Sequence, residues 1–448
     1  MEPDLKGPSC FDHRGCLIKS ERKRFMENVK SKSPKSIVAI TRGGRWEAKK
    51  VIGKGLDLIG GLSTVVKKGD QVLLKPNLGY PEVPGMPPWT CTTDARVLAA
   101  LTELCLEAGA KRVITGDMPA HHVRSSYMLA STGVQEAVEK VGGKVVCLDE
   151  EPFLSRKVSG GILLKKQALP KAVLDADVII NVPKIKPTRV GKWTLGFKNL
   201  FGLLPHEDRM ERHRIPEHFY ILTDLHRLVK PALTIMDGFV IQEGLGPRLG
   251  DPIDFGVVIM GRDPVATETV TVLAIGHEPY EQMVLPIAEK QGLGTGDLEK
   301  IEIRGEPLES VRRYTKVSPG DLWLNPLPNV VEYFGGACWG CGFWIQYTPY
   351  PWEVDKNKKY ALIVGNRPRL PDRFTEDEII VMGTCATRSR NQILKACAKG
   401  VTPRFIGGCP PYWERAHGYY EHHKIDKIPR APKANFIDTE ESDERKSS

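Results

Sequence analysis

Long hydrophobic runs are missing from this sequence of 448 residues. No stretch approaches the ~20 apolar residues that a membrane-spanning helix needs. The first residues, MEPDLKGPSCFDHRGC, also lack the basic and then apolar pattern of a secretory leader. Hydrophobic residues make up 41% and charged residues 27% of the chain, which is an ordinary globular composition. We therefore expect a soluble, cytoplasmic protein with no membrane span and about two or three domains.

Motifs for nucleic-acid binding are equally absent, although the formal net charge is +9. Much of the excess lies in residues 19–35, a run rich in Lys and Arg. Such runs are usually solvated, and no aromatic residues interleave a basic groove as they do in nucleic-acid readers. Since residues 1–35 show no apolar periodicity, we expect a basic flexible arm there and do not expect a nucleic-acid partner.

Apolar periodicity is abundant between residues 36 and 306. Segments typical of strands alternate with segments typical of helices, such as the amphipathic ARVLAALTELCLEAG, which Gly109 ends. Continuous apolar runs such as ADVIINV fit strands that are covered on both faces. This alternation predicts an α/β domain over residues 36–306, with a mostly parallel, doubly wound sheet.

A second, smaller unit is expected after a connector at residues 307–337. The strand-like segments KYALIVGN, EIIVMGTC and PRFIGGC accompany the helix-like NQILKACAKG. They predict a small α/β domain at residues 338–423. The charged tail at residues 424–448 has the composition of a disordered segment.

Cysteines crowd this second unit. The chain has ten cysteines, and in a cytosolic protein metal or redox roles are expected before disulfides. Cys338 and Cys341 form a Cys-x-x-Cys loop, while Cys385 and Cys409 each follow an apolar run that should be a parallel strand. Loops converge at the carboxyl ends of such strands, and four thiolates are what a [4Fe–4S] cluster needs. Cys397 lies in a helical pattern and is expected in the core.

A structural zinc site is the alternative for the same four thiolates. Zinc sites usually combine two tight Cys-x-x-Cys turns, and this region has one. The sequence therefore favours iron–sulfur, while a zinc site and unliganded redox thiols stay open.

The motifs GAC-WGC, GTCA and GCPP, in this order, resemble the cluster-binding half of the small subunits of nickel–iron hydrogenases and the related small subunit of complex I. The resemblance covers residues 335–415. It implies a [4Fe–4S] cluster held by Cys338, Cys341, Cys385 and Cys409. The nickel-bearing large subunit has no counterpart here, so hydrogenase activity is not implied.

Polar residues gather at predicted strand ends of the first domain. An ammonium group is a compact point charge suited to phosphate or carboxylate, an amide both donates and accepts, and glycines allow close backbone approach. Together these side chains predict a crevice that binds an anionic small molecule or cofactor, although lysines at loop ends are more often simply solvated. The candidates are Lys75, Asn77, Asn181, Lys184, Lys186, Lys198, Asn199, Gly244 and Gly246.

Two carboxylates in the same segments, Asp117 and Glu243, are candidate proton carriers, although acidic residues in glycine-rich loops are as often turn residues. No G-x-x-x-x-G-K-[ST] phosphate loop is present. His206, His213 and His226 flank the region without the spacing of a metal motif. The catalytic residues therefore stay open.

Residues 36–306 resemble, nearly end to end, the family known as domain of unknown function 362. The matching segments, in order, are LLKPNL, NVPKIKPT, TLGFKNLFGLLP, DGFVIQEGLGP and GRDPVA. Many members continue into a ferredoxin-like tail with two clusters, whereas this chain lacks a C-x-x-C-x-x-C-x-x-x-C-P run. The family is also distantly similar in fold to the nickel-dependent lactate racemase, whose catalytic histidines have no recognisable counterpart here.

These observations predict an iron–sulfur reductase. Electrons would pass from the [4Fe–4S] cluster to an anionic small molecule or cofactor in the crevice of the first domain, and a donor or acceptor protein would be a partner. An electron carrier or cluster-bearing scaffold for a partner enzyme is an alternative. A zinc-stabilised small-molecule binding protein without redox activity is another.

Overall fold

The computed structural model describes most of the chain from Lys35 onward. The described residues are 35–79, 87–120, 123–188, 191–212, 217–244, 246–247, 250–317, 329–335, 355, 357–408 and 434–437. No helix within these ranges is long and apolar enough to cross a membrane.

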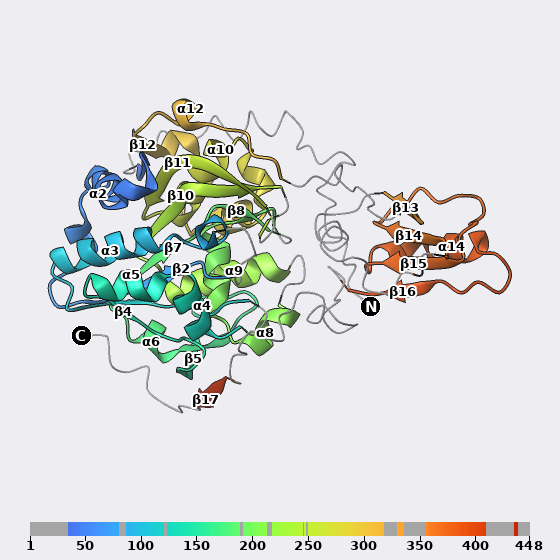
Figure 1. Cartoon of the computed structure of the whole chain (residues 1–448), viewed down its shortest axis with the longest axis horizontal. Helices are drawn as coiled ribbons and strands as arrows, with labels where there is room; N and C mark the ends of the chain where they lie inside the picture. The colour runs from blue at the N-terminus through green and yellow to red at the C-terminus, as the bar shows by residue number, and fades with distance from the viewer. Residues whose placement is uncertain are drawn as a thin grey trace, which may run out of the picture. The chain divides into compact units, whose positions relative to one another are not determined.

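An eight-stranded sheet forms the centre of the larger part (Figure 1). All of its strands run parallel except β11, which is antiparallel to both of its neighbours. The prediction of a mostly parallel α/β sheet is therefore confirmed. In spatial order the strands are β12 (Ile301–Gly305), β1 (Ser36–Arg42), β11 (Asp251–Gly261), β10 (Leu233–Glu243), β7 (Val178–Val182), β2 (Gln71–Pro76), β3 (Arg112–Thr115) and β4 (Lys144–Val145).

Helices cover both faces of this sheet because its strands are apolar on both sides (Figure 1). In β2, Val72 and Leu74 pack with one group of helices, whereas Leu73 faces the opposite core. The first group comprises α2 (Ala48–Leu58), α3 (Ala95–Glu107), α4 (Ser125–Ser131) and α5 (Val134–Lys140). The opposite face carries α6 (Lys171–Leu174), α9 (Glu217–Val229), α10 (Pro264–Ala274) and α11 (Val284–Lys290).

Short elements lie in the loops between these strands and helices. Four of them lie in or near the segments that carry the candidate polar residues. They are η3 (Pro88–Thr90), α7 (Gly196–Asn199), η4 (Leu200–Leu203) and α8 (His206–Glu211). The remaining ones are η1 (Arg45–Glu47), η2 (Leu62–Thr64), η5 (Pro279–Glu281), η6 (Leu298–Lys300), α12 (Leu308–Val311) and the two-stranded β8 (Lys186–Pro187) and β9 (Trp193–Thr194).

A separate four-stranded sheet has the order β13, β14, β15, β16 and is parallel throughout. Its strands are β13 (Val330–Phe334), β14 (Tyr360–Val364), β15 (Glu378–Met382) and β16 (Arg404–Ile406), with η8 (Ala386–Ser389) and α14 (Arg390–Ala396) between the last two. β13 falls in the segment that we expected to be a connector. Cys397 caps α14 and is half-buried, so it follows the helix rather than lying inside it.

A third sheet joins distant parts of the chain. In it, β5 (Pro152–Lys157) pairs with β6 (Lys166–Pro170) on one side and with β17 (Asn435–Ile437) on the other. β17 lies in the segment expected as a charged tail.

Candidate functional site

The order of strands reverses between β2 and β7. From β2 the chain moves outward to β3 and β4, then returns to place β7 on the other side of β2 and β10 beyond it. In open α/β sheets, ligands bind outside the carboxyl ends of the strands at such a switch point. Lys75 and Asn77 lie at the carboxyl end of β2, and Asn181 lies beside Lys75 in the register of β7. The topology therefore brings predicted residues to this edge of the sheet.

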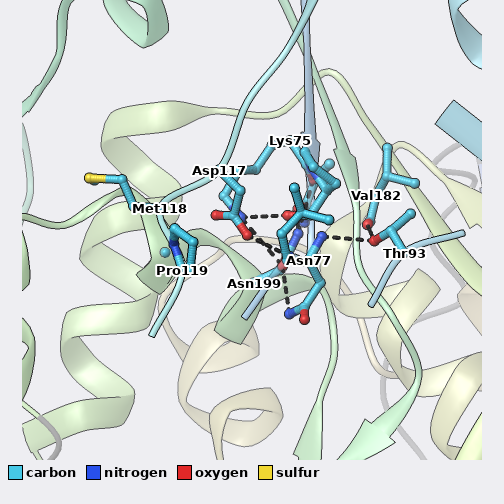
Figure 2. A network of polar contacts seen from close by, with 12 residues as sticks. Lys75, Asn77, Thr93, Asp117, Met118, Pro119, Val182 and Asn199 are labelled. Atoms are coloured by element: carbon cyan, nitrogen blue, oxygen red, sulfur yellow. Dashed lines mark hydrogen bonds and ion pairs between the residues drawn. The ribbon is translucent and has the colours of Figure 1, made fainter. Parts of the chain in front are cut away.

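Asn199 of α7 joins these residues into one network (Figure 2). Its Oδ1 accepts from Asn77 Nδ2 at 3.0 Å and from Lys75 Nζ at 3.4 Å. Its Nδ2 donates to Asn181 Oδ1 at 2.8 Å and to the Lys75 carbonyl at 3.1 Å. All four side chains are buried. A four-residue helix thus carries the residue that connects β2 with β7.

Asp117 closes the network on the side of β3. Its Oδ1 lies 2.7 Å from Lys75 Nζ, and its Oδ2 accepts from the backbone N–H of Leu78 at 2.7 Å. Burial lowers the pKa of Lys75, and the charge of Asp117 opposes that shift. Gly202 covers the pair so closely that a Cβ there would lie 2.6 Å from Asp117 Oδ1. Glycine is required at that position because any side chain would displace the ion pair.

A second buried ion pair lies beside the first. Lys184 Nζ is 3.0 Å from Asp237 Oδ2, and both side chains are fully buried. The same oxygen accepts from the backbone N–H of Asp94 at 2.8 Å. Asp94 Oδ2 in turn accepts a hydrogen bond from Arg45 Nε at 2.6 Å. Burial raises the pKa of Asp237, and the charge of Lys184 opposes that shift.

Lys186 is the third buried lysine, and it donates to the Cys91 carbonyl. Burial lowers its pKa to about 8, and the positive charges of Lys184 and Lys75 contribute in the same direction. Three ammonium groups are thus close enough to interact, with the carboxylates of Asp117 and Asp237 among them.

Gly79 lies beside Asn77 and Lys186, and we call these three residues the Gly79 cradle. A Cβ at Gly79 would lie 3.5 Å from Asn77 Oδ1 and 3.9 Å from Lys186 Nζ. These are ordinary contact distances, so the described atoms leave room for a methyl-sized group. Asn77 Oδ1 is buried and has no hydrogen-bond donor among the described residues.

Lys198 lies next to Asn199 in sequence but makes different contacts. Its Nζ is 3.2 Å from His218 Nε2 and 5.4 Å from the centre of the Phe201 ring. The predicted lysines therefore divide into a group of three near the switch point and Lys198 beside an imidazole.

Comparison with known proteins gives this domain a family. The model of the domain of unknown function DUF362 matches residues 72–272. A thylakoid-associated protein of Synechocystis sp. is 31% identical over 249 residues, which are 53% of this chain and 73% of that protein. The chain belongs to the DUF362 family. The residues of the site described above lie within the matched range, except Arg45.

Two solved structures are similar to a lower degree. The lactate racemase apoprotein of Thermoanaerobacterium thermosaccharolyticum has a TM-score of 0.34 and 12% identity, covering 52% of this chain and 56% of that chain. A protein from Thermotoga maritima has a TM-score of 0.27 and 10% identity, covering 56% of this chain and 60% of that one. The chain thus spans less than two thirds of either structure.

The remaining candidates of the DUF362 domain have structural contacts. Glu243 Oε2 accepts from the backbone N–H of Lys316 at 2.8 Å, and the Gly244 N–H donates to the Lys316 carbonyl at 2.7 Å. Gly244 adopts a φ of +70°, which favours glycine. A Cβ at Gly246 would lie 2.6 Å from the Pro187 carbonyl oxygen. Glu243 and Gly244 thus hold a following segment, and Gly246 packs against the strand that carries Lys186.

Sequence reasoning missed several residues of the site. Asp94 and Asp237 were not proposed as partners of basic residues, because they lie far from those residues in sequence. Arg209 was missed as well. Its buried guanidinium donates to the carbonyls of Met118, Pro119, Gly202 and Leu204, which fixes the loop after Asp117. For Asp237 the sequence did offer a signal, because Asp237 and Gly238 directly follow an apolar, strand-like run.

Three of the four predicted cluster ligands, Cys338, Cys341 and Cys409, lie outside the described residues. Cys385 is described and is half-buried at the start of η8. No three His, Cys, Asp or Glu side chains are arranged to hold a metal ion within the described part of the chain.

The strands that precede these cysteines end at the same position in the register of the sheet. Phe334, Val364, Met382 and Ile406 form one row across β13 to β16. Beyond that row the Thr384 N–H donates to the Gly408 carbonyl at 2.9 Å, and the Gly408 N–H donates to Thr384 Oγ1 at 3.0 Å. The residues immediately before Cys385 and Cys409 are thus hydrogen-bonded to each other.

Proposed function

We propose that the DUF362 domain binds a small anion that also donates a hydrogen bond, at the carboxyl ends of β2 and β7. The observation that carries this proposal is the Gly79 cradle. It combines a buried ammonium group on Lys186 with the acceptor Asn77 Oδ1, which no described donor satisfies. An unsatisfied buried acceptor is costly, and a ligand hydroxyl or amino group removes that cost.

Electrostatics favours an anion at this position. The site gathers the ammonium groups of Lys75, Lys184 and Lys186 around two carboxylates, so positive charge is in excess. In a water-poor site this excess attracts a carboxylate or phosphate more strongly than it would in solvent. Because the pKa of Lys186 is about 8, most of this side chain keeps its positive charge at neutral pH.

The ion pairs serve to hold the site in shape. Asp117 is engaged by Lys75 and by the Leu78 N–H, which supports a positioning role rather than that of the proton carrier expected from sequence. Glu243 is engaged with Lys316, which likewise supports a structural role. We therefore assign ligand contact to Lys186 and Asn77, and positioning to Lys75, Asp117 and Asn199.

Calorimetric titration with glycolate and acetate tests the proposal, because the two differ in one hydroxyl donor. We expect glycolate to bind about fivefold more tightly than acetate, which corresponds to one neutral hydrogen bond of ~1 kcal/mol. Gly79→Ala fills the cradle and should abolish binding of both. Gly53→Ala, with nothing within 4 Å of its Cβ, is the matched control. Undiminished binding by Gly79→Ala, or none by the wild type, would contradict the proposal.

For the smaller sheet we propose a [4Fe–4S] cluster held by Cys338, Cys341, Cys385 and Cys409. The level strand ends and the hydrogen bonds between Thr384 and Gly408 support it, because Cys385 and Cys409 directly follow those two residues. Cys338 and Cys341 follow β13, which lies two strands from β15, or ~10 Å at the usual spacing. Such a cluster would supply one-electron chemistry.

Anaerobic purification with iron and sulfide analysis tests this second function. We expect about four irons per chain and broad absorbance near ~400 nm. Cys385→Ala should lose the iron, whereas Cys397→Ala should retain it. Stoichiometric zinc without iron would contradict the proposal and support the zinc-stabilised alternative.

Together the two sites support a reductase that passes electrons to the bound anion and takes them from a partner protein. Reductant-dependent turnover of the bound anion distinguishes this role from that of an electron carrier or cluster-bearing scaffold.

A further inference from the structure

Glu268 of α10 is a fully buried carboxylate outside the ligand site. Its Oε2 accepts from the Phe197 N–H at 3.0 Å, and the Gly196 N–H also donates to the carboxylate. Its Oε1 accepts from Gln282 Nε2 at 2.7 Å. No described cation forms an ion pair with it, so three neutral donors balance its charge.

Such an arrangement is costly, because a buried charge is normally compensated by an opposite charge. Burial raises the pKa of Glu268 to about 7, and the hydrogen bonds from Gln282, Phe197 and Gly196 reduce the shift. Both the ionised and the protonated form are therefore populated near neutral pH. Ionisable groups with strongly shifted pKa values are concentrated at functional sites.

Helix α7 connects Glu268 with the ligand site. Its first two N–H groups, on Gly196 and Phe197, point at the carboxylate. The Gly196 carbonyl accepts from Asn181 Nδ2 at 2.9 Å. Asn199, the last residue of α7, bonds to Lys75, Asn77 and Asn181. Because α7 has only four residues, a movement of its first residues also moves Asn199 at its end.

Gln282 provides for both protonation states of Glu268. Its Nε2 donates to Glu268 and, at 3.3 Å, to the Trp193 carbonyl. Its Oε1 is buried and has no donor among the described residues. Rotation of this amide by half a turn would present Oε1 to a protonated Glu268, which then donates instead of accepting. The pair thus has two hydrogen-bonded arrangements.

We propose that Glu268 is a positioning residue that links proton binding to the ligand site through α7. Ionised Glu268 holds the start of α7 with charge-assisted hydrogen bonds, which are about twice as strong as neutral ones. Protonated Glu268 holds it less firmly, Asn199 loses its fixed place, and the anion binds more weakly. The ligand part of this inference rests on the proposed anion-binding function.

Four charged groups on the elements packed against α10 have partners other than Glu268. Lys198 of α7 contacts His218, Glu281 of η5 contacts Lys192 and His277, and Asp237 of β10 contacts Lys184. Glu289 of α11 accepts from the Gly296 N–H. None of these charges is a partner of Glu268, so a pH step that Glu268→Gln removes is assigned to Glu268.

The test follows the Phe197 amide resonance and glycolate affinity from about pH 5.5 to about pH 7.5, a range in which Lys186, with a pKa of about 8, keeps most of its charge. It compares the full-length wild type with Glu268→Gln and with Glu299→Gln, an exposed control. The wild type and control should show one step near neutral pH in both readouts, with glycolate about fivefold to tenfold weaker on the acidic side. Glu268→Gln should show neither step and bind glycolate with the acidic-side affinity throughout.

A Glu268→Gln protein that keeps both steps would overturn the inference. If glycolate fails to bind the wild type while the Phe197 step still depends on Glu268, the anion-binding function fails and the link between Glu268 and α7 stands. If glycolate binds but the Phe197 resonance has no step, the link fails and the binding function stands.

Discussion

At the scale of single residues, the site depends on charges that are buried in pairs. Lys75 and Asp117 are almost fully excluded from solvent, and so are Lys184 and Asp237. Removing one member of a buried pair leaves the other uncompensated, which is far more costly than removing both. The stability of the DUF362 domain should therefore respond more to single than to paired substitutions at these positions.

Asp117→Asn tests this expectation, because an amide oxygen still accepts from the Leu78 N–H but no longer balances Lys75. We expect it to lower the free energy of unfolding by about 3 kcal/mol. Adding Lys75→Met should recover at least half of that loss. Urea unfolding at neutral pH measures both. Glu378→Gln, in an exposed pair with Lys358, is the control and should change little. A double variant no more stable than the single one would contradict the account.

Glu268 gives a second prediction, which concerns stability against pH. Its pKa in the folded chain, about 7, is above the ordinary value of 4.5. Protonated Glu268 therefore makes its full contribution to the free energy of unfolding below about pH 4.5. That contribution is lost as the pH rises through about 7. Glu268→Gln removes this loss of unfolding free energy. It amounts to roughly 3 kcal/mol, because each unit of pKa difference corresponds to about 1.36 kcal/mol.

Thermal melting measures the effect. Glu268→Gln should melt above the wild type at pH 8 and close to it at pH 5. A variant that gains stability and loses ligand affinity would fit a residue retained for function at a cost in stability. Equal melting temperatures of the two proteins at pH 8 would show that burying the Glu268 carboxylate does not destabilise the folded chain.

At the scale of elements, the sequence predicted the long strands and helices well. Apolar runs such as VIINV and VLLKP are strands buried on both sides, and the amphipathic segment that Gly109 ends is α3. The short elements α7 and η4 could not be predicted, because four residues carry no usable periodicity. Their positions are set by tertiary contacts such as those of Asn199 and Glu268.

Part of the candidate site could also be predicted, because some of its residues lie at the ends of apolar strands. Strand ends indicated Lys75, Asn77 and Asn181, since parallel strands deliver their carboxyl ends to one edge. The pairing of Lys184 with Asp237 was not predictable, because it depends on which strands are neighbours. Strand order is a property of the whole sheet and leaves no local pattern in the sequence.

Helix α3 provides a prediction at this scale. Asp94 is its N-cap, accepting from the Arg96 N–H at 3.0 Å, and also pairs with Arg45. Asp94→Ala should lower the free energy of unfolding by about 1–2 kcal/mol, because both the cap and the ion pair are lost. Asp94→Asn keeps the cap and should lose less. Denaturant unfolding of both variants checks the order, and an equal loss would show that the cap contributes nothing.

At the scale of the whole molecule, the chain combines a DUF362 domain with a smaller parallel sheet whose strand ends precede the cysteines. The residues of the proposed anion site all lie in the described part of the chain. The cluster stays a prediction supported by strand register, since three of its four proposed ligands lie outside the described residues. The motif order in the sequence was informative here because cluster ligands are close to strand ends.

The central claim is that a small anion with a hydrogen-bond donor occupies the Gly79 cradle. A crystal structure of the full-length chain grown with glycolate tests it most directly. The account predicts the carboxylate within hydrogen-bond distance of Lys186 Nζ and the hydroxyl donating to Asn77 Oδ1, at about 2.7–3.2 Å. Glycolate bound elsewhere, or a protein donor already on Asn77 Oδ1, would contradict it.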